Sequence, residues 1–180
     1  MTAQRLAIRD VVLFEPRAFA DERGQFFESF NAQQFAEATG MSVSFVQDNQ
    51  STSRKGVLRG LHYQLPPHAQ GKLVRVVRGA AFDVVVDIRR GSPSFGKWVG
   101  ETLSAQNRRQ LWIPAGFAHG FVALEEETEF LYKATDFWDK VSERSIRWDD
   151  PEIGIDWPAL ELIVSQKDRD AGPLGSAELP

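Results

Sequence analysis

The chain has 180 residues, of which 42% are hydrophobic and 26% are charged, a composition typical of one globular domain spanning residues 1–180. Its formal net charge of −4 argues against nucleic acid or an anionic membrane surface as the main partner, although local arginines could still hold a small anionic ligand. The absence of cysteine excludes disulfides, thiolate metal sites and cysteine nucleophiles. No apolar run is long enough to span a bilayer, and residues 1–14 lack the features of a signal peptide, so we expect a cytoplasmic protein.

The first clear element is a helix over residues 31–39. Asn31 has the side chain of an N-cap, and Gly40 follows the last helical residue as a C-terminal stop. The residues Phe30, Phe35 and Ala38 would form its apolar face.

Most of the remaining chain predicts short β-strands. In residues 81–88 the side chains alternate, with Phe82, Val84, Val86 and Ile88 on one face and Asp83, Val85 and Asp87 on a second, partly wet face. Further strands are expected at residues 73–78, 98–103, 109–113, 117–124 and 130–135. Many short strands at regular spacing predict an all-β sandwich or barrel.

The two ends of the chain differ from this pattern. Residues 6–14 predict an early strand, which we expect to pair with another sheet edge, in this subunit or in a second one. The tail from Gly172 to Pro180 is polar and weakly patterned, and we expect it to be mobile.

Two of the three histidines lie in informative sequence contexts. His62 follows Arg59-Gly60-Leu61, and His119 ends a Pro-x-Gly-x-x-His stretch that begins at Pro114. That stretch resembles the second half-motif of cupins, in which a tight turn leads into a strand whose histidine points into the barrel.

The expected ligands of a metal-binding cupin are incomplete. The first histidine pair is replaced by His62-x-Gln64, and Lys72 stands where a carboxylate ligand would be expected. A charged lysine offers no lone pair to a cation, and tight sites need three or four ligands. We therefore expect no metal.

The same residues suit proton transfer next to a carbonyl group. His62 could act as the base, Lys72 could stabilise an enolate oxygen, and Tyr132 could return a proton to the opposite face. Taken alone, Tyr132 is more typical of a core residue with its hydroxyl at the rim. A histidine base also needs a carboxylate to fix its tautomer, for which Asp168 and Asp83 are both candidates.

Several motifs in order are similar to those of the dTDP-4-dehydrorhamnose 3,5-epimerase family. The resemblance runs from about residue 14 to residue 168 through Gln47-Asp48-Asn49, Leu58-Arg59-Gly60-Leu61-His62-Tyr63-Gln64, Gly71-Lys72-Leu73-Val74-Arg75, Ser92-Pro93-Ser94-Phe95-Gly96, Leu111-Trp112-Ile113-Pro114 and Trp148-Asp149-Asp150-Pro151. It implies a double-stranded β-helix (cupin or jelly-roll) barrel with a few short peripheral helices. It also implies a homodimer with exchanged N-terminal strands, and an enzyme that uses no cofactor.

The resemblance also implies roles for individual residues. His62 would be the base, oriented by Asp168, with Lys72 at the enolate and Tyr132 as the acid. The substrate, a dTDP-linked 4-keto-6-deoxy sugar that is inverted at C3 and C5, would be bound by Arg23, Glu28, Gln47, Asp48, Asn49, Arg59, His119, Glu143 and Lys167.

One departure from the family leaves alternatives open. The family commonly carries a tyrosine near the sugar, whereas this chain has Phe137-Trp138 there. An epimerase acting on one carbon, or a ketoisomerase on the same nucleotide sugar, is therefore a close alternative. A metal-dependent cupin and a non-catalytic module that binds nucleotide sugars are more distant ones.

Overall fold

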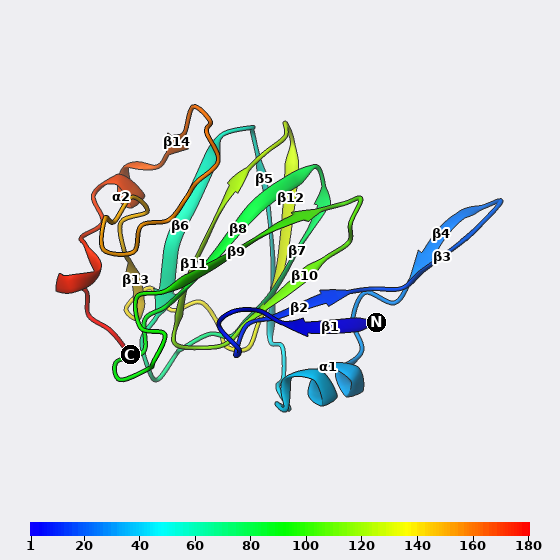
Figure 1. The fold of residues 1–180 in the computed structure, drawn as a ribbon, viewed down its shortest axis with the longest axis horizontal. Helices are drawn as coiled ribbons and strands as arrows, with labels where there is room; N and C mark the ends of the chain where they lie inside the picture. The colour runs from blue at the N-terminus through cyan, green and yellow to red at the C-terminus, as the bar shows by residue number, and fades with distance from the viewer.

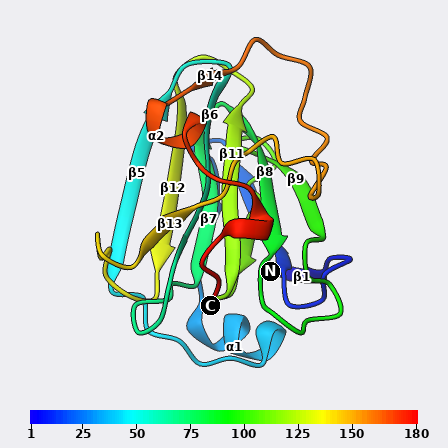
Figure 2. The same cartoon turned by 90° about the vertical axis from the view of Figure 1, so that its left-hand side faces the viewer.

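Two antiparallel β-sheets packed face to face form the body of the protein in the computed structural model, which describes residues 1–180 (Figures 1 and 2). The first sheet has the strand order β1 (Thr2–Arg5), β2 (Val12–Glu15), β10 (Gln110–Ile113), β7 (Lys72–Arg78), β12 (Thr128–Ala134) and β5 (Gln47–Ser53). The second has the order β13 (Glu143–Ser145), β6 (Val57–Gln64), β11 (Phe117–Ala123), β8 (Ala80–Asp87) and β9 (Trp98–Ser104), with β14 (Ile163–Val164) parallel to β6.

Successive strands from β5 to β8 and from β10 to β12 alternate between the two sheets. This alternation between antiparallel sheets is typical of a jelly roll and confirms the predicted fold class. The helices are short and peripheral: α1 (Ala32–Thr39), α2 (Gln166–Arg169) and the 3₁₀ turn η1 (Leu174–Ser176). No helix is long and apolar enough to cross a membrane.

The helix expected after Asn31 is confirmed together with both of its ends. The Asn31 side chain accepts hydrogen bonds from the backbone N–H groups of Gln33 and Gln34, and Gly40 takes the left-handed conformation with φ of 75°. Phe35 is buried, and its ring stands edge-on to Trp112 with 4.9 Å between the ring centroids. Burial of Phe35 therefore fixes α1 against the first sheet.

All six strands expected from alternation or apolar runs are present, with ends shifted by no more than two residues. The expected second face of β8 is wrong in one respect, because Asp83, Val85 and Asp87 are completely buried rather than partly wet. Val85 packs in the core between the sheets, whereas Val84 and Val86 pack under the C-terminal segments that cover the second sheet. A strand covered on both faces lacks a wet side.

The expected strand over residues 6–14 is also wrong. β1 ends before this stretch, residues 6–11 form a turn in which the Leu6 N–H donates to the Val11 carbonyl, and β2 begins only at Val12. β2 pairs with β10 of the same chain, and β1 pairs only with β2, so that β1 forms a free edge of the first sheet.

A β-hairpin of β3 (Ala18–Asp21) and β4 (Gly24–Phe27) projects away from the barrel (Figure 1). The opposite end of the chain packs closely: Leu174 is buried, and the Tyr63 hydroxyl donates to the Glu178 carbonyl at 2.7 Å. These contacts favour an ordered tail. The mobility expected for residues 172–180 is not measured by them and stays a prediction.

Two glycines let β6 and β11 approach closely at an irregularity in their pairing. A Cβ on Gly60, whose φ is 139°, would lie 2.5 Å from the Gly120 Cα, and one on Gly120 would lie 2.8 Å from the Arg59 carbonyl oxygen. Only glycine fits at both positions. On one side of this contact His62 lies directly opposite His119 in the register of the two strands.

Candidate active site

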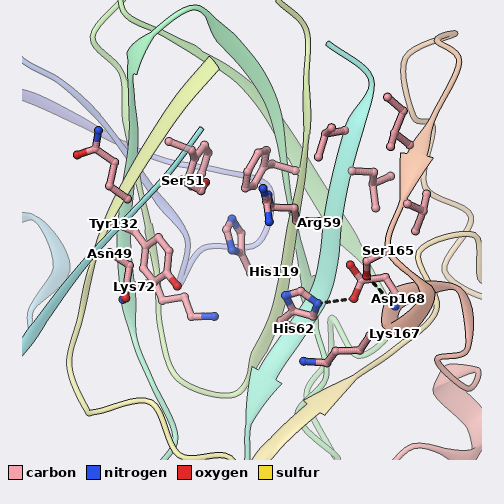
Figure 3. Close-up of a pocket in the computed structure, with 17 residues that line it drawn as sticks. Asn49, Ser51, Arg59, His62, Lys72, His119, Tyr132, Ser165, Lys167 and Asp168 are labelled. Carbon is pink, nitrogen blue, oxygen red and sulfur yellow. Dashed lines mark hydrogen bonds and ion pairs between the residues drawn. The ribbon is translucent and has the colours of Figure 1, made fainter. Parts of the chain in front are cut away.

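A cavity of about 550 Å³ opens between the two sheets, a volume in the range of small-molecule sites. Strands of both sheets, β14 and the α2 segment line it (Figure 3). Its apolar part includes Phe121 and Phe130, whose rings stack with centroids 4.0 Å apart. The polar side chains that line it are Asn49, Gln50, Ser51, Arg59, His62, Lys72, His119, Tyr132, Ser165, Lys167 and Asp168.

His62 forms a hydrogen-bonded pair with Asp168. The His62 Nε2 atom lies 2.6 Å from the Asp168 Oδ1, which leaves Nδ1 without a protein partner (Figure 3). Burial raises the pKa of Asp168, but the hydrogen bond and charge of His62, with donors from Ser165 and Gly60, outweigh it and hold that pKa below its usual value. The carboxylate therefore fixes the ring with Nε2 protonated and leaves Nδ1 as the basic atom.

The α2 segment brings Asp168 to His62 across 106 positions of the chain. The Ser165 hydroxyl caps α2 by accepting a hydrogen bond from the Asp168 N–H. Asp168 itself is 3% exposed, beneath the backbone of β6, where the Gly60 N–H also points to it. The Ser-x-x-Asp spacing at residues 165–168 is a recognisable capping signal. We did not predict a role for Ser165.

Lys72 begins β7 on the opposite sheet, and its ammonium group extends into the cavity towards His62 (Figure 3). Burial lowers the pKa of Lys72 to about 8, and the negative charges of Glu143 and Asp83 limit the fall. Its Nζ lies 5.9 Å from the centre of the Tyr132 ring. Lys72 is therefore mostly charged at pH 7 and loses its proton as the pH rises past about 8.

Tyr132 stands on β12, in the same sheet as Lys72, and faces His62 across the cavity (Figure 3). Burial raises the pKa of its phenol, the charge of Glu143 adds to the rise, and Arg59 opposes it. The phenol is thus protonated at neutral pH and able to donate. The chain's other tyrosine, Tyr63, donates to the C-terminal tail and does not line the cavity.

His119 and Asp83 form a second histidine–carboxylate pair. The His119 Nε2 lies 2.8 Å from the Asp83 Oδ2, and Asp83 is completely buried. Of the two carboxylates considered for His62, the structure thus pairs Asp168 with His62 and Asp83 with His119.

The expected substrate-binding residues divide into two groups. Asn49, Arg59, His119 and Lys167 line the cavity, and two others adjoin these residues: Gln47 donates to the Asn49 Oδ1 at 2.9 Å, and Glu143 is 2.6 Å from Lys167. Gln47, Asn49 and Ser51 alternate along β5 and share one face.

Asp48, Arg23 and Glu28 do not line this cavity, so their expected contacts with the substrate stay a prediction. Asp48 lies on the other face of β5, where Lys133 donates to it at 3.0 Å. Arg23 is at the tip of the projecting hairpin with 85% of its side chain exposed, and Glu28 follows that hairpin and accepts from Gln34. Side-chain alternation explains Asp48, and the hairpin's direction explains the other two.

Phe137 and Trp138 stand near this group with more than half of each side chain exposed. The Trp138 backbone N–H donates to the Gln47 Oε1 at 2.9 Å. Burial raises the pKa of the Glu143 carboxyl, but its pairing with Lys167, with smaller contributions from Trp138 and His62, holds it below its usual value. This arrangement ties an exposed aromatic pair to the polar residues of β5 and β13.

The two sheets thus hold complementary groups on facing walls. His62 comes from the second sheet, and Tyr132 and Lys72 come from the first. Such a site can take a proton from one face of a carbon beside a carbonyl, stabilise the enolate and return a proton to the other face. No group of three or more His, Cys, Asp or Glu side chains is placed to share a metal ion.

Known proteins resemble the chain over nearly its whole length. The model of the family described as dTDP-4-dehydrorhamnose 3,5-epimerase matches residues 5–176. The Pseudomonas aeruginosa dTDP-4-dehydrorhamnose 3,5-epimerase is 63% identical over 99% of this chain and 98% of its own length. The Streptomyces niveus dTDP-4-dehydrorhamnose 3-epimerase is 40% identical over 98% of this chain and 86% of its own.

A solved relative supports the same assignment in three dimensions. The dTDP-6-deoxy-D-glucose-3,5-epimerase of Legionella pneumophila, in complex with dTDP-4-keto-L-rhamnose, superposes with a TM-score of 0.96 and is 49% identical, covering 99% of this chain and 97% of that one. The barrel, the facing side chains of His62 and Tyr132, and these relatives lead to one conclusion: the chain belongs to the dTDP-4-dehydrorhamnose 3,5-epimerase family.

Proposed function

We propose that the chain epimerises dTDP-4-dehydro-6-deoxy-D-glucose at C3 and C5 to give dTDP-4-dehydro-L-rhamnose, with His62 as base and Tyr132 as acid. The observation that carries this proposal is the placement of His62 and Tyr132 on opposite walls, with Lys72 beside them. Inversion of a carbon requires removal and return of a proton on opposite faces, and this placement supplies both groups.

The first half-reaction removes a proton from carbon. His62 Nδ1 takes the proton from C5 or C3, and the electrons of the C–H bond move through the new C=C bond to the C4 oxygen. The Lys72 ammonium stabilises the resulting enolate, a contribution of roughly 3–4 kcal/mol for one well-placed donor. A positioned base adds about 10²–10⁴-fold in rate.

The second half-reaction returns a proton to the opposite face. The enolate collapses to the C4 ketone as its carbon takes the proton of the Tyr132 phenol, and the tyrosinate and His62 then exchange protons with solvent. Since both C3 and C5 flank the same ketone, one base and one enolate site serve both carbons after the sugar ring reorients.

Charged and polar groups at the cavity mouth match a nucleoside diphosphate. Arg59 lies exposed on β6, and its Nε donates to the Ser53 hydroxyl at 3.2 Å, which orients the guanidinium. With Lys167 it offers positive charge for the diphosphate, and His119 lines the same cavity. The amide side chains of Gln47 and Asn49 suit the base and sugar.

The missing nucleotide contacts come, in this proposal, from a second copy of the chain in a homodimer. The projecting hairpin exposes Phe19 and Phe26 to 55% and 73%, and apolar groups presented in this way favour burial against a partner. The free edge of β1 offers unpaired backbone groups for the same contact. Arg23 and Glu28 would then enter the partner's cavity.

Epimerisation at C3 alone is the second candidate. It is favoured by the tyrosine-free Phe137-Trp138 pair and by the similarity to a 3-epimerase. NMR of the sugar product formed in D₂O separates the two activities, because deuterium enters both C3 and C5 in the first and C3 only in the second.

Replacement of the base tests the catalytic assignment. We expect His62→Ala to lower deuterium incorporation into the sugar by at least about 10²-fold, because the C–H proton then lacks an acceptor. Binding of dTDP, measured by calorimetry, should change little. His68→Ala is the matched control, since His68 pairs with Asp136 outside the cavity. Near-normal exchange by His62→Ala would refute the assignment.

The pH dependence follows from the charge of Lys72. With its pKa lowered to about 8, the ammonium loses its proton as the pH rises through that value, so enolate stabilisation is present below pH 8 and lost above it. We expect kcat to fall about tenfold per pH unit on this alkaline side. Lys72→Arg should abolish this decline while Lys97→Ala, at an exposed turn, leaves it in place. An unchanged decline in Lys72→Arg would contradict the role of Lys72.

Subunit complementation tests the shared site. We expect the Arg23→Ala variant and the His62→Ala variant each to be impaired when expressed alone. When the two variants are expressed together, we expect about a quarter of the wild-type exchange rate. Half of randomly formed dimers are mixed, and each mixed dimer has one site with both residues intact when Arg23 acts in the partner. A mixture with no recovery, or a strictly monomeric 20.3 kDa species in sedimentation at micromolar concentration, would disprove the exchange.

A further inference from the structure

One carboxylate inside the barrel is explained neither by folding nor by the proton-transfer steps above. Asp83 lies in the middle of β8 with 0% exposure, and its Oδ1 atom has no hydrogen-bond partner. Its other oxygen, Oδ2, accepts from His119 Nε2 at 2.8 Å. Burial raises the pKa of Asp83, and its hydrogen bond with His119 and the charges of His119 and Lys72 oppose that rise. A buried carboxylate with one unsatisfied oxygen destabilises a fold unless nearby positive charge compensates it.

The other buried carboxylate of β8 shows what a structural aspartate looks like in this chain. Asp87, also 0% exposed, accepts hydrogen bonds from Arg89, Ser92 and Ser94, which together build the turn after the strand. Burial raises the pKa of Asp87, yet these donors hold it at about 2. Asp83 has one donor, stabilises no turn and faces the cavity side of the sheet.

The charges around Asp83 and Lys72 come from several elements. Glu143 of β13 and Asp83 of β8 are the negative charges that act on Lys72, while the cavity's other charged or titratable groups are Arg59, His62, His119, Tyr132, Lys167 and Asp168. Glu143 is paired with Lys167, and Asp168 with His62. From β9, the residue opposite Asp83 is Glu101, which pairs with Arg109. Of the two carboxylates that act on Lys72, Asp83 is thus the one without a lysine or arginine partner, and its one hydrogen-bond partner is His119.

We infer that Asp83 is a positioning residue of this site: anchored by His119, its buried negative charge keeps the Lys72 ammonium protonated inside the barrel. The inference rests on the proposed function, since Lys72 matters there as the cation that stabilises the enolate. It adds a group outside the cavity lining whose purpose is to preserve that charge. The buried Asp83 charge then lowers the stability of the fold, and its benefit lies in catalysis.

Asp83→Asn tests this inference because asparagine keeps the shape and can still hydrogen-bond His119. We expect the variant to remain folded and to melt no lower than the wild type, since it removes a buried charge whose second oxygen has no hydrogen-bond donor. The alkaline decline of kcat should move to lower pH by about one unit, because Lys72 loses a nearby negative charge. An alkaline decline that coincides with that of the wild type would overturn the inference.

Asp87→Asn is the matched control on the same strand. It removes a carboxylate that three side chains satisfy, so it should lower the melting temperature and leave the alkaline decline where it is in the wild type. A shift of the decline in Asp87→Asn equal to that in Asp83→Asn would overturn the inference, since any buried aspartate of β8 would then have the same effect.

A measurement without substrate separates this inference from the proposed function. NMR titration of the Asp83 carboxyl carbon in the wild-type protein should find Asp83 ionised at pH 7, and a protonated carboxyl at that pH would overturn the inference even if Asp83→Asn did not fold. Failure of the wild-type protein to exchange any sugar proton would instead refute the proposed function.

Discussion

The pairing of β6 with β11 places His62 directly opposite His119, and the rest of the site depends on this register. The pairing is possible only because Gly60 and Gly120 allow the two backbones to approach where any Cβ would collide. With the register set, each histidine meets a different carboxylate through Nε2: His62 meets Asp168 from the C-terminal segment, and His119 meets Asp83 from the next strand. The barrel thus holds two oriented imidazoles side by side.

The opposite wall supplies what these imidazoles lack. Lys72 and Tyr132 come from the first sheet, and burial lowers the pKa of the lysine and raises that of the phenol. Both shifts suit chemistry at neutral pH, because the ammonium is still charged and the phenol still holds its proton. The buried setting makes each electrostatic interaction stronger and makes each unpaired charge costly, so the carboxylates near the cavity each have a histidine or lysine partner.

Much of this arrangement could be predicted from the sequence. The other features could not be predicted, for physical reasons. The α1 helix was predictable because its cap, stop and apolar face are all local signals. The strand β5 was not predicted, since its residues Gln47–Ser53 are polar on both faces: one face lines the cavity, and the other carries Asp48. Residues 6–14 read as one apolar strand although their backbone turns back between β1 and β2.

The site itself divides in the same way. Residue types and ordered motifs pointed to His62, Lys72, Tyr132 and Asp168, and the structure brings these four together. The residues alone left Asp168 and Asp83 both open as partners of His62, because the pairing depends on strand register and on a contact between residues 106 positions apart; the resemblance pointed to Asp168. The positions of Arg23 and Glu28 could not be predicted either, since the direction of the β3–β4 hairpin is a property of the whole fold.

The central claim is that the base and the acid act from opposite faces of the sugar. The most direct test is the stereochemistry of deuterium incorporation by Tyr132→Phe in D₂O, followed by NMR of both the remaining substrate and the product. The account predicts that this variant labels the substrate with retention of configuration, because His62 returns a deuteron to the face it deprotonates, while inverted product forms far more slowly than in the wild type. Inverted, doubly labelled product formed at the wild-type rate would contradict the account, since protonation of the opposite face would then not depend on Tyr132.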